Sequence, residues 1–296
     1  MKNGFLLVNK KEGITTNSIN NLVKKRLNVS KVGHLGTLDP FACGLVIIAI
    51  NEATKFLPYV DDDYKSYIAT IKLGEETSTF DNTSEIINNM KVRSYSNIEI
   101  INVLKSFLGK SMQTPPKYSA KSINGVRAYD LARKNIDFKL KEIEIEIKEI
   151  ELINYDRNNN IITFSALVSK GTYIRTLGID IAKKLNTIGH LIYLNRDSIG
   201  RYKLDNAINE EDINTKCIIK IEDFFLFDKY NINDNEYKKV SNGNCLKLNS
   251  DKDKLLIFYK SELIALYSKN DNIYLCERKL NIWMYMKMFQ YQQIWI

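Results

Sequence analysis

The chain has 296 residues, of which 44% are hydrophobic and 26% charged, so it can form one large domain, or a large and a small domain, with a buried core. Its 43 Lys and Arg residues against 35 Asp and Glu residues leave a net charge of +8, which favours a polyanionic partner such as nucleic acid. Four scattered cysteines (Cys43, Cys217, Cys245 and Cys276) and two histidines (His34 and His190) exclude a structural zinc cluster and favour a reducing compartment over a disulfide framework.

The chain opens with an apolar run over residues 4–8 that is typical of a first strand. The run is too short for the core of a signal peptide and far too short for a membrane span. We therefore expect a cytoplasmic protein that does not bind a membrane.

The N-terminal part alternates between strand and helix patterns. Apolar spacing and turn residues predict a strand over 4–8, a helix over 16–27, a Gly-rich loop over 33–44, a buried strand over 45–50, a short helix over 52–57 and a strand over 64–73. Thr15 or Thr16 can cap the first helix. Pro58 should stop the short helix, and Gly74 should end the last strand.

The middle part of the chain also contains both helix and strand patterns. The sequence predicts a helix over 97–108, an extended segment at 115–116, a short helix over 125–134, half-exposed strands around 143–147 and 162–168, and a helix over 173–185. The helix over 97–108 should bury a face made of Ile98, Ile101, Leu104 and Leu108. Strands and helices mix without a regular βαβ rhythm, which favours an α+β fold over a doubly wound sheet.

The residue composition of the chain changes near residue 229. Residues 228–235 are polar and rich in Asn, which indicates a boundary between domains at 1–228 and 229–282. Strand-like runs over 255–259, 263–267 and 273–276 predict a small β-rich module. Residues 283–296 form an aromatic tail that either docks on the core, which we favour, or binds a partner.

Asp39 is the candidate for chemistry within the Gly-rich segment. Pro40 lacks a backbone donor and pushes Asp39 away from helical geometry, so the carboxylate should lie on an irregular loop that leads into a buried strand. Taken alone, Asp39 could be a nucleophile, an acid or base, or a turn residue, and the turn interpretation is favoured.

The string of residues from Gly33 to Gly44 favours a catalytic role for Asp39 over the turn interpretation. It closely resembles the G-H-x-G-T-L-D-P-x-A-x-G-L signature of the TruB family, the tRNA pseudouridine-55 synthases. Further blocks resemble that family in the same order: residues 65–67 with 73–74 and 77–81, residues 113–120 with Gly125, Tyr129 and Arg133, residues 170–176, and residues 189–196. The resemblance spans residues 4–205 and extends more loosely to 280.

Five positions depart from the family pattern. Asn9 and Lys11 stand where the family has the Asp and Pro of D-K-P-x-G, Phe41 and Cys43 where Leu and Thr are usual, and Asn195 where Arg is common. These changes can alter packing or affinity, but none removes a residue that the chemistry needs.

The resemblance implies a pseudouridine synthase fold. Its central mixed or antiparallel sheet would be flanked by helices, with a thumb loop at about 110–137 and a PUA-like RNA-binding module at the C-terminus. It also implies isomerisation of the T-loop uridine of tRNA, by attack on the sugar, attack on the base, or formation of a glycal. Nothing is oxidised and no group enters from outside, so we expect no cofactor and no metal.

The resemblance also assigns roles to residues. Asp39 would be the covalent catalyst, and Arg175 would pair with it and keep it ionised. Tyr67 would stack on the uracil, and Leu194 would pack against the other side of the base. His34 would enter the RNA loop after base flipping. Further substrate-binding candidates are Lys117, Tyr118, Arg133 and Lys170, with Lys31, Lys121 and Arg127 as additional phosphate contacts.

Two alternatives remain at this point. One is a guide-RNA-dependent pseudouridine synthase subunit, which usually carries a longer C-terminal domain and basic tails. The other is a non-catalytic tRNA-binding protein, which would predict loss of Asp39, Tyr67 or Arg175, yet all three are present. We therefore expect an enzyme that acts as a monomer on the T-arm without an obligatory protein partner.

Overall fold

The structure, a computed structural model, describes residues 2–119, 121–123, 125–134 and 136–280. The aromatic tail predicted at 283–296 lies outside these residues. Among the described helices, none is long and apolar enough to cross a lipid bilayer.

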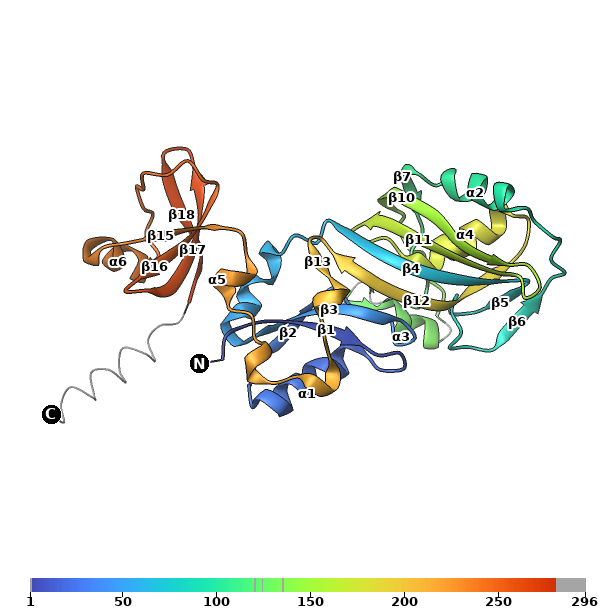
Figure 1. The fold of residues 1–296 in the computed structure, drawn as a ribbon, viewed down its shortest axis with the longest axis horizontal. Helices are drawn as coiled ribbons and strands as arrows, with labels where there is room; N and C mark the ends of the chain where they lie inside the picture. Colours follow the sequence, from blue (N-terminus) through green and yellow to red (C-terminus); the bar gives the residue numbers. More distant parts are fainter. Residues whose placement is uncertain (1, 120, 124, 135, 281–296) are drawn as a thin grey trace.

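A large sheet forms the centre of the protein (Figure 1). Its strand order is β14-β1-β3-β12-β4-β11-β10-β7, with β2 beside β3 and β13 beside β12. The bounds are β1 (Gly4–Lys10), β2 (Val32–Leu35), β3 (Cys43–Ile50), β4 (Tyr64–Leu73), β7 (Gly109–Gln113), β10 (Ile143–Asp156), β11 (Ile161–Ser169), β12 (Gly189–Ile199), β13 (Tyr202–Lys203) and β14 (Ile208–Asn209). Most neighbours are antiparallel, but β1–β14 and β3–β12 are parallel, so the sheet is mixed and the predicted α+β class is confirmed.

The longer α-helices of the large domain cover one face of this sheet. The helices of the large domain are α1 (Thr16–Leu27), α2 (Asn97–Lys105), α3 (Ala128–Arg133), α4 (Ile174–Lys184) and α5 (Ile221–Phe224), with 3-10 helices η1 (Asn51–Tyr59), η2 (Leu204–Asn206), η3 (Glu210–Asp212) and η4 (Thr215–Cys217). α2 packs against β10, α4 against β12 and α1 against β2. Two small hairpins complete the domain, β5 (Glu75–Thr77) with β6 (Ile86–Asn89), and β8 (Ser122–Ile123) with β9 (Val126–Arg127).

The burial of the strands follows from what covers them. In β3, Val46 and Ile48 belong to the main core cluster under the helices, while Leu45 and Ile47 belong to a second cluster on the opposite face. Both faces of β1 and β3 are covered, which explains their continuous apolar runs. β4 and β11 alternate between buried and half-buried residues instead, because only one of their faces lies under helices.

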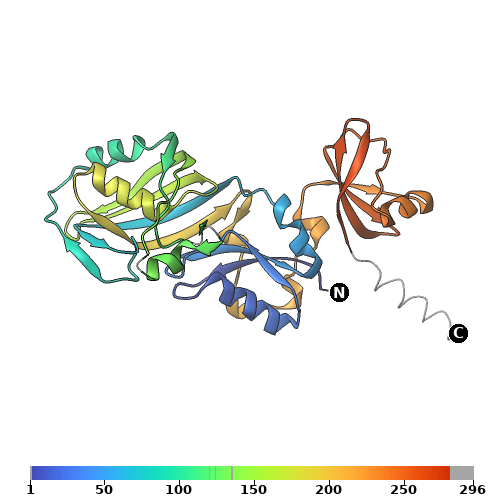
Figure 2. The same cartoon turned by 180° about the vertical axis from the view of Figure 1, so that it is seen from behind.

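The C-terminal residues form a separate four-stranded sheet of order β15-β16-β17-β18. The elements are β15 (Asp228–Asn231), α6 (Asp234–Ser241), β16 (Lys254–Tyr259), β17 (Glu262–Asn270) and β18 (Ile273–Lys279). Leu256 and Leu266 of this sheet share a buried cluster with Phe56 of η1, and both views show the small sheet at the end of the molecule away from α2 (Figures 1 and 2).

Several predicted elements are confirmed, including α1 with its cap. The Thr15 side chain accepts a hydrogen bond from Ser18 N, and Asn28 closes the helix in the left-handed conformation at φ 49°. β4 and α4 also match their predicted spans to within a residue or two.

Three predictions were wrong in detail. Residues 33–35 of the expected loop belong to β2, because they extend the sheet beside β3. Pro58 lies inside η1 rather than ending it, since only one donor is lost and Val60 N still donates to Leu57 O.

The third error concerns the buried face of α2. Ile100 and Leu104 are buried, whereas Ile98 is 71% exposed and Leu108 is 47% exposed. The helix carries apolar residues on several faces, so spacing alone did not fix the face, and it ends at Lys105 before the turn into β7.

Substitution of alanine on α2 tests this corrected face. Ile100→Ala should lower the free energy of unfolding by about 2–5 kcal/mol because it leaves a cavity in the core. The matched Ile98→Ala change, on the exposed face, should stay within about 0.5 kcal/mol of wild type. Urea unfolding measures both, and equal losses would contradict the observed face.

Candidate active site

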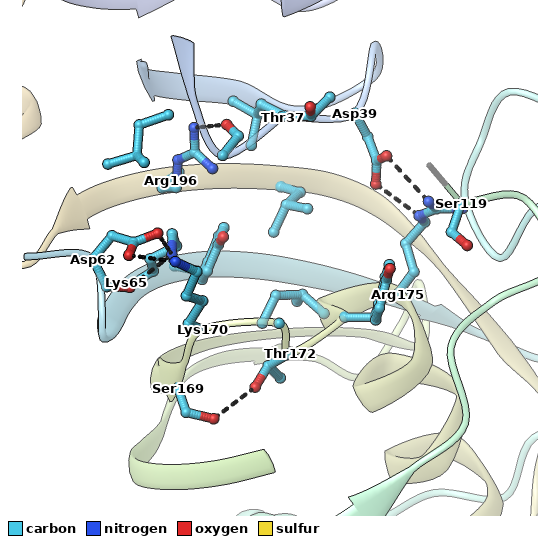
Figure 3. A pocket seen from close by; sticks show the side chains of 18 residues that line it. Thr37, Asp39, Asp62, Lys65, Ser119, Ser169, Lys170, Thr172, Arg175 and Arg196 are labelled. Carbon is cyan, nitrogen blue, oxygen red and sulfur yellow. Dashed lines mark hydrogen bonds and ion pairs between the residues drawn. The ribbon is translucent and has the colours of Figure 1, made fainter. Parts of the chain in front are cut away.

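A cavity of about 480 Å³ opens on the helix-covered face of the large sheet, between the loop after β2 and the start of α4 (Figure 3). Five chain segments that are distant in sequence line it: residues 35–39, 62–67, 119, 169–175 and 194–196. The cavity brings together five of the predicted site residues, namely Asp39, Tyr67, Lys170, Arg175 and Leu194.

Asp39 and Arg175 form a bidentate ion pair in this cavity. Arg175 Nε lies 2.8 Å from Asp39 Oδ2, and Arg175 Nη2 lies 3.1 Å from Oδ1. The Arg175 side chain is 4% exposed, whereas that of Asp39 is 36% exposed. A fork-to-fork pair fixes the plane of the carboxylate. The carboxylate is therefore oriented and still open to the cavity.

Backbone contacts on both sides of Asp39 hold its loop. Thr16 Oγ1 lies 3.0 Å from both the N and the O of Leu38, so one hydroxyl binds both polar groups of the preceding residue. The buried Lys10 ammonium donates to three backbone carbonyls, including that of Pro40 at 3.2 Å. Burial lowers the pKa of Lys10 to about 8, so the side chain is still charged at neutral pH.

Arg175 is itself held by three further groups. Its Nη1 donates to Thr79 O at 2.8 Å, and its Nη2 donates to Tyr118 O at 2.9 Å. Asp81, a buried residue, lies 3.6 Å from Nη1 and accepts a hydrogen bond from Thr79 Oγ1 at 2.7 Å. The guanidinium thus lies between two carboxylates, and Asp81 is a site residue that the sequence analysis missed. Its place at the end of block 77–81, which resembles the family, was the available signal.

Tyr67 and Leu194 form neighbouring walls of the cavity. Tyr67 lies on β4 opposite Arg196 of β12, and Leu194 lies opposite Ala69 on the same pair of strands. Both side chains are more than nine-tenths buried, and both line the cavity. Together they give it an apolar and aromatic side beside the charged pair.

Arg196 is a second residue that the sequence analysis left without a role. It is 1% exposed, and its Nε donates to Leu45 O at 2.8 Å while its Nη2 donates to Gly36 O at 3.0 Å. Gly36 has φ +66°, a conformation that favours glycine. Arg196 therefore ties the loop that carries Asp39 to the sheet.

A cluster of two lysines and one aspartate occupies the other side of the cavity (Figure 3). Asp62 lies 3.2 Å from Lys65 Nζ and 2.8 Å from Lys170 Nζ. Burial raises the pKa of Asp62, but the hydrogen bonds and charges of Lys170 and Lys65 outweigh it and leave the pKa lowered. Lys65 is buried and Lys170 is largely exposed, so Lys170 is the cation that can reach solvent or substrate.

A second cavity of about 630 Å³ adjoins the first and shares Asp39 and Arg175 with it. Three predicted substrate-binding residues, His34, Tyr118 and Arg133, line this second cavity. Asp39 therefore stands at the junction of the two.

His34 is held on both of its ring nitrogens. Nδ1 lies 2.9 Å from Asn20 Nδ2, and Nε2 lies 3.2 Å from Thr37 Oγ1. Burial, and then the charge of Arg196, lower the pKa of His34 below its ordinary value. The imidazole is therefore neutral at neutral pH.

Other predicted contacts lie elsewhere. Lys117 is exposed, pairs with Asp137 at 3.4 Å and is not among the residues that line either cavity. Lys121 donates to Lys141 O at 3.4 Å, and the Arg127 side chain lies outside the described part of the chain. His190 Nδ1 lies 3.0 Å from Glu75 O, away from the site.

Lys11, which stands where the family has a proline, makes contacts of its own that hold the turn. The Lys11 backbone N, which a proline would lack, donates to Glu210 Oε1 at 2.7 Å, and Lys11 Nζ lies 3.1 Å from Glu211 Oε2. These contacts tie the turn after β1 to η3.

The chain is similar in sequence to known proteins of one family. The sequence model described as TruB family pseudouridylate synthase, N-terminal domain, matches residues 24–174. The tRNA pseudouridine synthase B of Mycoplasma mobile is 40% identical, over 88% of this chain and 89% of that protein. That of Mesoplasma florum is 38% identical, over 94% and 98% respectively.

Solved structures show the same fold. The chain resembles the one in a Cbf5-Nop10-Gar1 complex with a TM-score of 0.66 and 22% identity, covering 93% of this chain and 85% of that one. At this identity the similarity concerns the fold alone.

The depressed pKa of His34 makes stability depend on pH. Because its folded pKa lies below the value of 6.5 in the unfolded chain, the unfolded chain takes up the proton first as the pH falls. The free energy of unfolding should therefore decrease as the pH falls through 6.5 towards the folded pKa. His34→Gln should lack this component. Urea unfolding at a series of pH values measures it, and identical pH profiles for both proteins would contradict the assignment.

Proposed function

Since the chain belongs to the TruB family and is a tRNA pseudouridine synthase, we propose that it modifies a uridine in the T-arm and that Asp39 is its catalyst. The observation that supports this proposal best is the bidentate Asp39–Arg175 pair at the junction of two cavities.

The reaction needs a group that acts on the nucleoside while the base turns. The bond from ribose C1′ to uracil N1 breaks, the bond from C1′ to C5 forms, C5 loses a proton and N1 gains one. Attack of Asp39 on the sugar or on the base, and proton abstraction that gives a glycal, each require a carboxylate with a lone pair directed at the nucleoside. Arg175 supplies this orientation because both of its bonded nitrogens lie in the plane of the fork.

We assign the uracil to the apolar side of the first cavity. Tyr67 would stack on the base and assist removal of the C5 proton, and Leu194 would pack on its other side. Lys170 lines the same cavity, where its exposed ammonium suits the phosphate of the same nucleotide.

We assign the rest of the RNA loop to the second cavity. A uridine in a folded T-loop must leave its stack before it can reach Asp39. His34, Tyr118 and Arg133 line the space through which the nucleotide would pass and can contact the displaced loop. Lys117, on the exposed surface of the 110–137 segment, suits a phosphate farther along the arm.

The remaining parts of the proposal concern the whole molecule. We propose that residues 1–228 act as the catalytic domain and that residues 229–282 form an RNA-binding module. The exposed Lys229 is an example of the basic surface that such a module needs. The enzyme would act as a monomer in the cytoplasm, without cofactor, metal or obligatory protein partner.

Loss of the Asp39 carboxylate should remove the reaction. Asp39→Asn should abolish tritium release from C5-labelled uridine in unmodified tRNA, while tRNA affinity stays within about tenfold, because one side chain contributes little to phosphate contacts. Asp63→Asn, an equal change at an exposed aspartate, should leave turnover unchanged. Normal turnover of the Asp39 variant would overturn the catalytic assignment.

The T-arm proposal can be tested on a minimal RNA. An isolated T-arm stem-loop should be modified by the purified protein without any guide RNA. A matched stem-loop of the anticodon arm should release tritium at least about a hundredfold more slowly, since shape selects the substrate. Activity that appears only after addition of a guide RNA would favour the guide-dependent class.

A further inference from the structure

Asn20 is a polar residue on the buried face of α1. Its buried neighbours on that face are Thr16, Ile19, Val23 and Leu27, and Asn20 is itself 7% exposed. Burying an amide in such surroundings is unfavourable unless the amide makes hydrogen bonds. The other polar residue of this buried face, Thr16, is satisfied by the Leu38 backbone, so the Asn20 amide likewise needs a hydrogen-bond partner.

That partner is His34. Asn20 Nδ2 lies 2.9 Å from His34 Nδ1, and Asn20 Oδ1 is buried without a hydrogen-bond partner among the described residues. Turning the amide around would put two buried N–H donors where the oxygen now lies, and unpaired buried N–H groups are rarer than unpaired carbonyl oxygens. The amide nitrogen is therefore the donor, and His34 Nδ1 is the acceptor.

The acceptor role of His34 Nδ1 determines which nitrogen carries the hydrogen of the neutral ring. A neutral imidazole carries one hydrogen, so with Nδ1 accepting, this hydrogen lies on Nε2. Nε2 is 3.2 Å from Thr37 Oγ1, and both residues line the second cavity beside Asp39. The hydrogen is thus directed at Thr37 Oγ1 on the wall of the cavity that we assign to the RNA loop, where an RNA oxygen would share it with the hydroxyl or replace the hydroxyl as acceptor.

We infer that Asn20 is a positioning residue that holds His34 in the Nε2–H tautomer, so that the ring presents a neutral N–H donor to an oxygen of the bound RNA. This inference rests on the proposed function for the identity of the acceptor. The tautomer itself does not depend on that function.

The protein contains its own reference for the tautomer. His190, the other histidine of the chain, has Nδ1 3.0 Å from the Glu75 carbonyl, which can only accept. Neutral His190 must therefore carry its hydrogen on Nδ1. The two histidines are expected to be opposite tautomers in one protein.

A long-range 1H–15N correlation spectrum of the free protein, at a pH about two units above the ordinary imidazole pKa, distinguishes the tautomers. His34→Gln assigns the signals by elimination. Wild type should show the pattern of an Nε2–H ring for His34 and of an Nδ1–H ring for His190. An Nδ1–H pattern for His34 would overturn the inference, whatever the protein's activity.

Two variants of Asn20 test the consequence for RNA binding. Asn20→Leu removes the donor, so His34 should become a mixture of tautomers, and KM should rise about three- to tenfold, the value of one hydrogen bond. Asn20→Asp supplies an acceptor, so neutral His34 should switch to Nδ1–H and lose its donor on Nε2. In both variants kcat should stay within about twofold of wild type, because Asn20 touches neither Asp39 nor the base.

The pH dependence of the Asn20→Asp variant separates positioning from packing. As the pH falls and His34 becomes an imidazolium, Nε2 regains a hydrogen, so the KM defect of this variant should disappear at low pH. Arg196 is the charged group that acts on the His34 ring. Other charged groups lie on the elements around it: Asp39, Asp81, Arg133 and Arg175 in the same cavity, Lys24, Lys25 and Arg26 in the last turn of α1, and Glu52 with Lys55 on η1.

Asn21, the exposed next residue on α1, gives the matched controls Asn21→Leu and Asn21→Asp, which should behave as wild type. A KM for Asn20→Asp that is equally raised at all pH values would indicate a merely structural effect and would overturn the inference. An inactive wild-type protein with the expected spectrum would contradict the proposed function and leave the tautomer assignment standing.

Discussion

The ion pair between Asp39 and Arg175 is the interaction on which the site depends. An aspartate on a loop is free to rotate, and a nucleoside in the cavity would meet a carboxylate of undefined direction. The guanidinium removes this freedom because it binds both carboxylate oxygens. Arg175 in turn cannot move, since two backbone carbonyls and the buried Asp81 take up its remaining donors.

The fold supplies each of these contacts from a different element. Arg175 comes from the first turn of α4, Asp81 from the turn after β5, and the Tyr118 carbonyl from the segment between β7 and β8. Arg196 and Thr16 both form hydrogen bonds with the backbone of the loop that carries Asp39. Removing any one of these supports would shift the carboxylate, and a shift of about 1 Å can cost a hundredfold in rate.

Much of this arrangement could be predicted from the sequence, for physical reasons that differ by residue. α1 and β4 follow from regular apolar spacing, with Thr15 and Gly74 at their ends, and Asp39 follows from an unusual string of glycines, proline and acid. Asp81 and Arg196 could not be given roles in the same way, because a buried charge is recognisable only through its partners, and these partners are backbone carbonyls or residues far along the chain. The face of α2 was wrong because apolar residues surround that helix. The Asn20–His34 contact joins a helix to a strand and leaves no mark in the local sequence pattern.

The most direct test of the account is the single-turnover rate of Arg175→Lys on tRNA. Lysine keeps the positive charge but offers one ammonium in place of the planar fork. The account predicts that the isomerisation rate falls by about a hundredfold or more, with tRNA affinity within about tenfold and an unchanged near-ultraviolet circular dichroism spectrum. A rate equal to that of wild type would contradict it, because the carboxylate of Asp39 would then need no oriented partner.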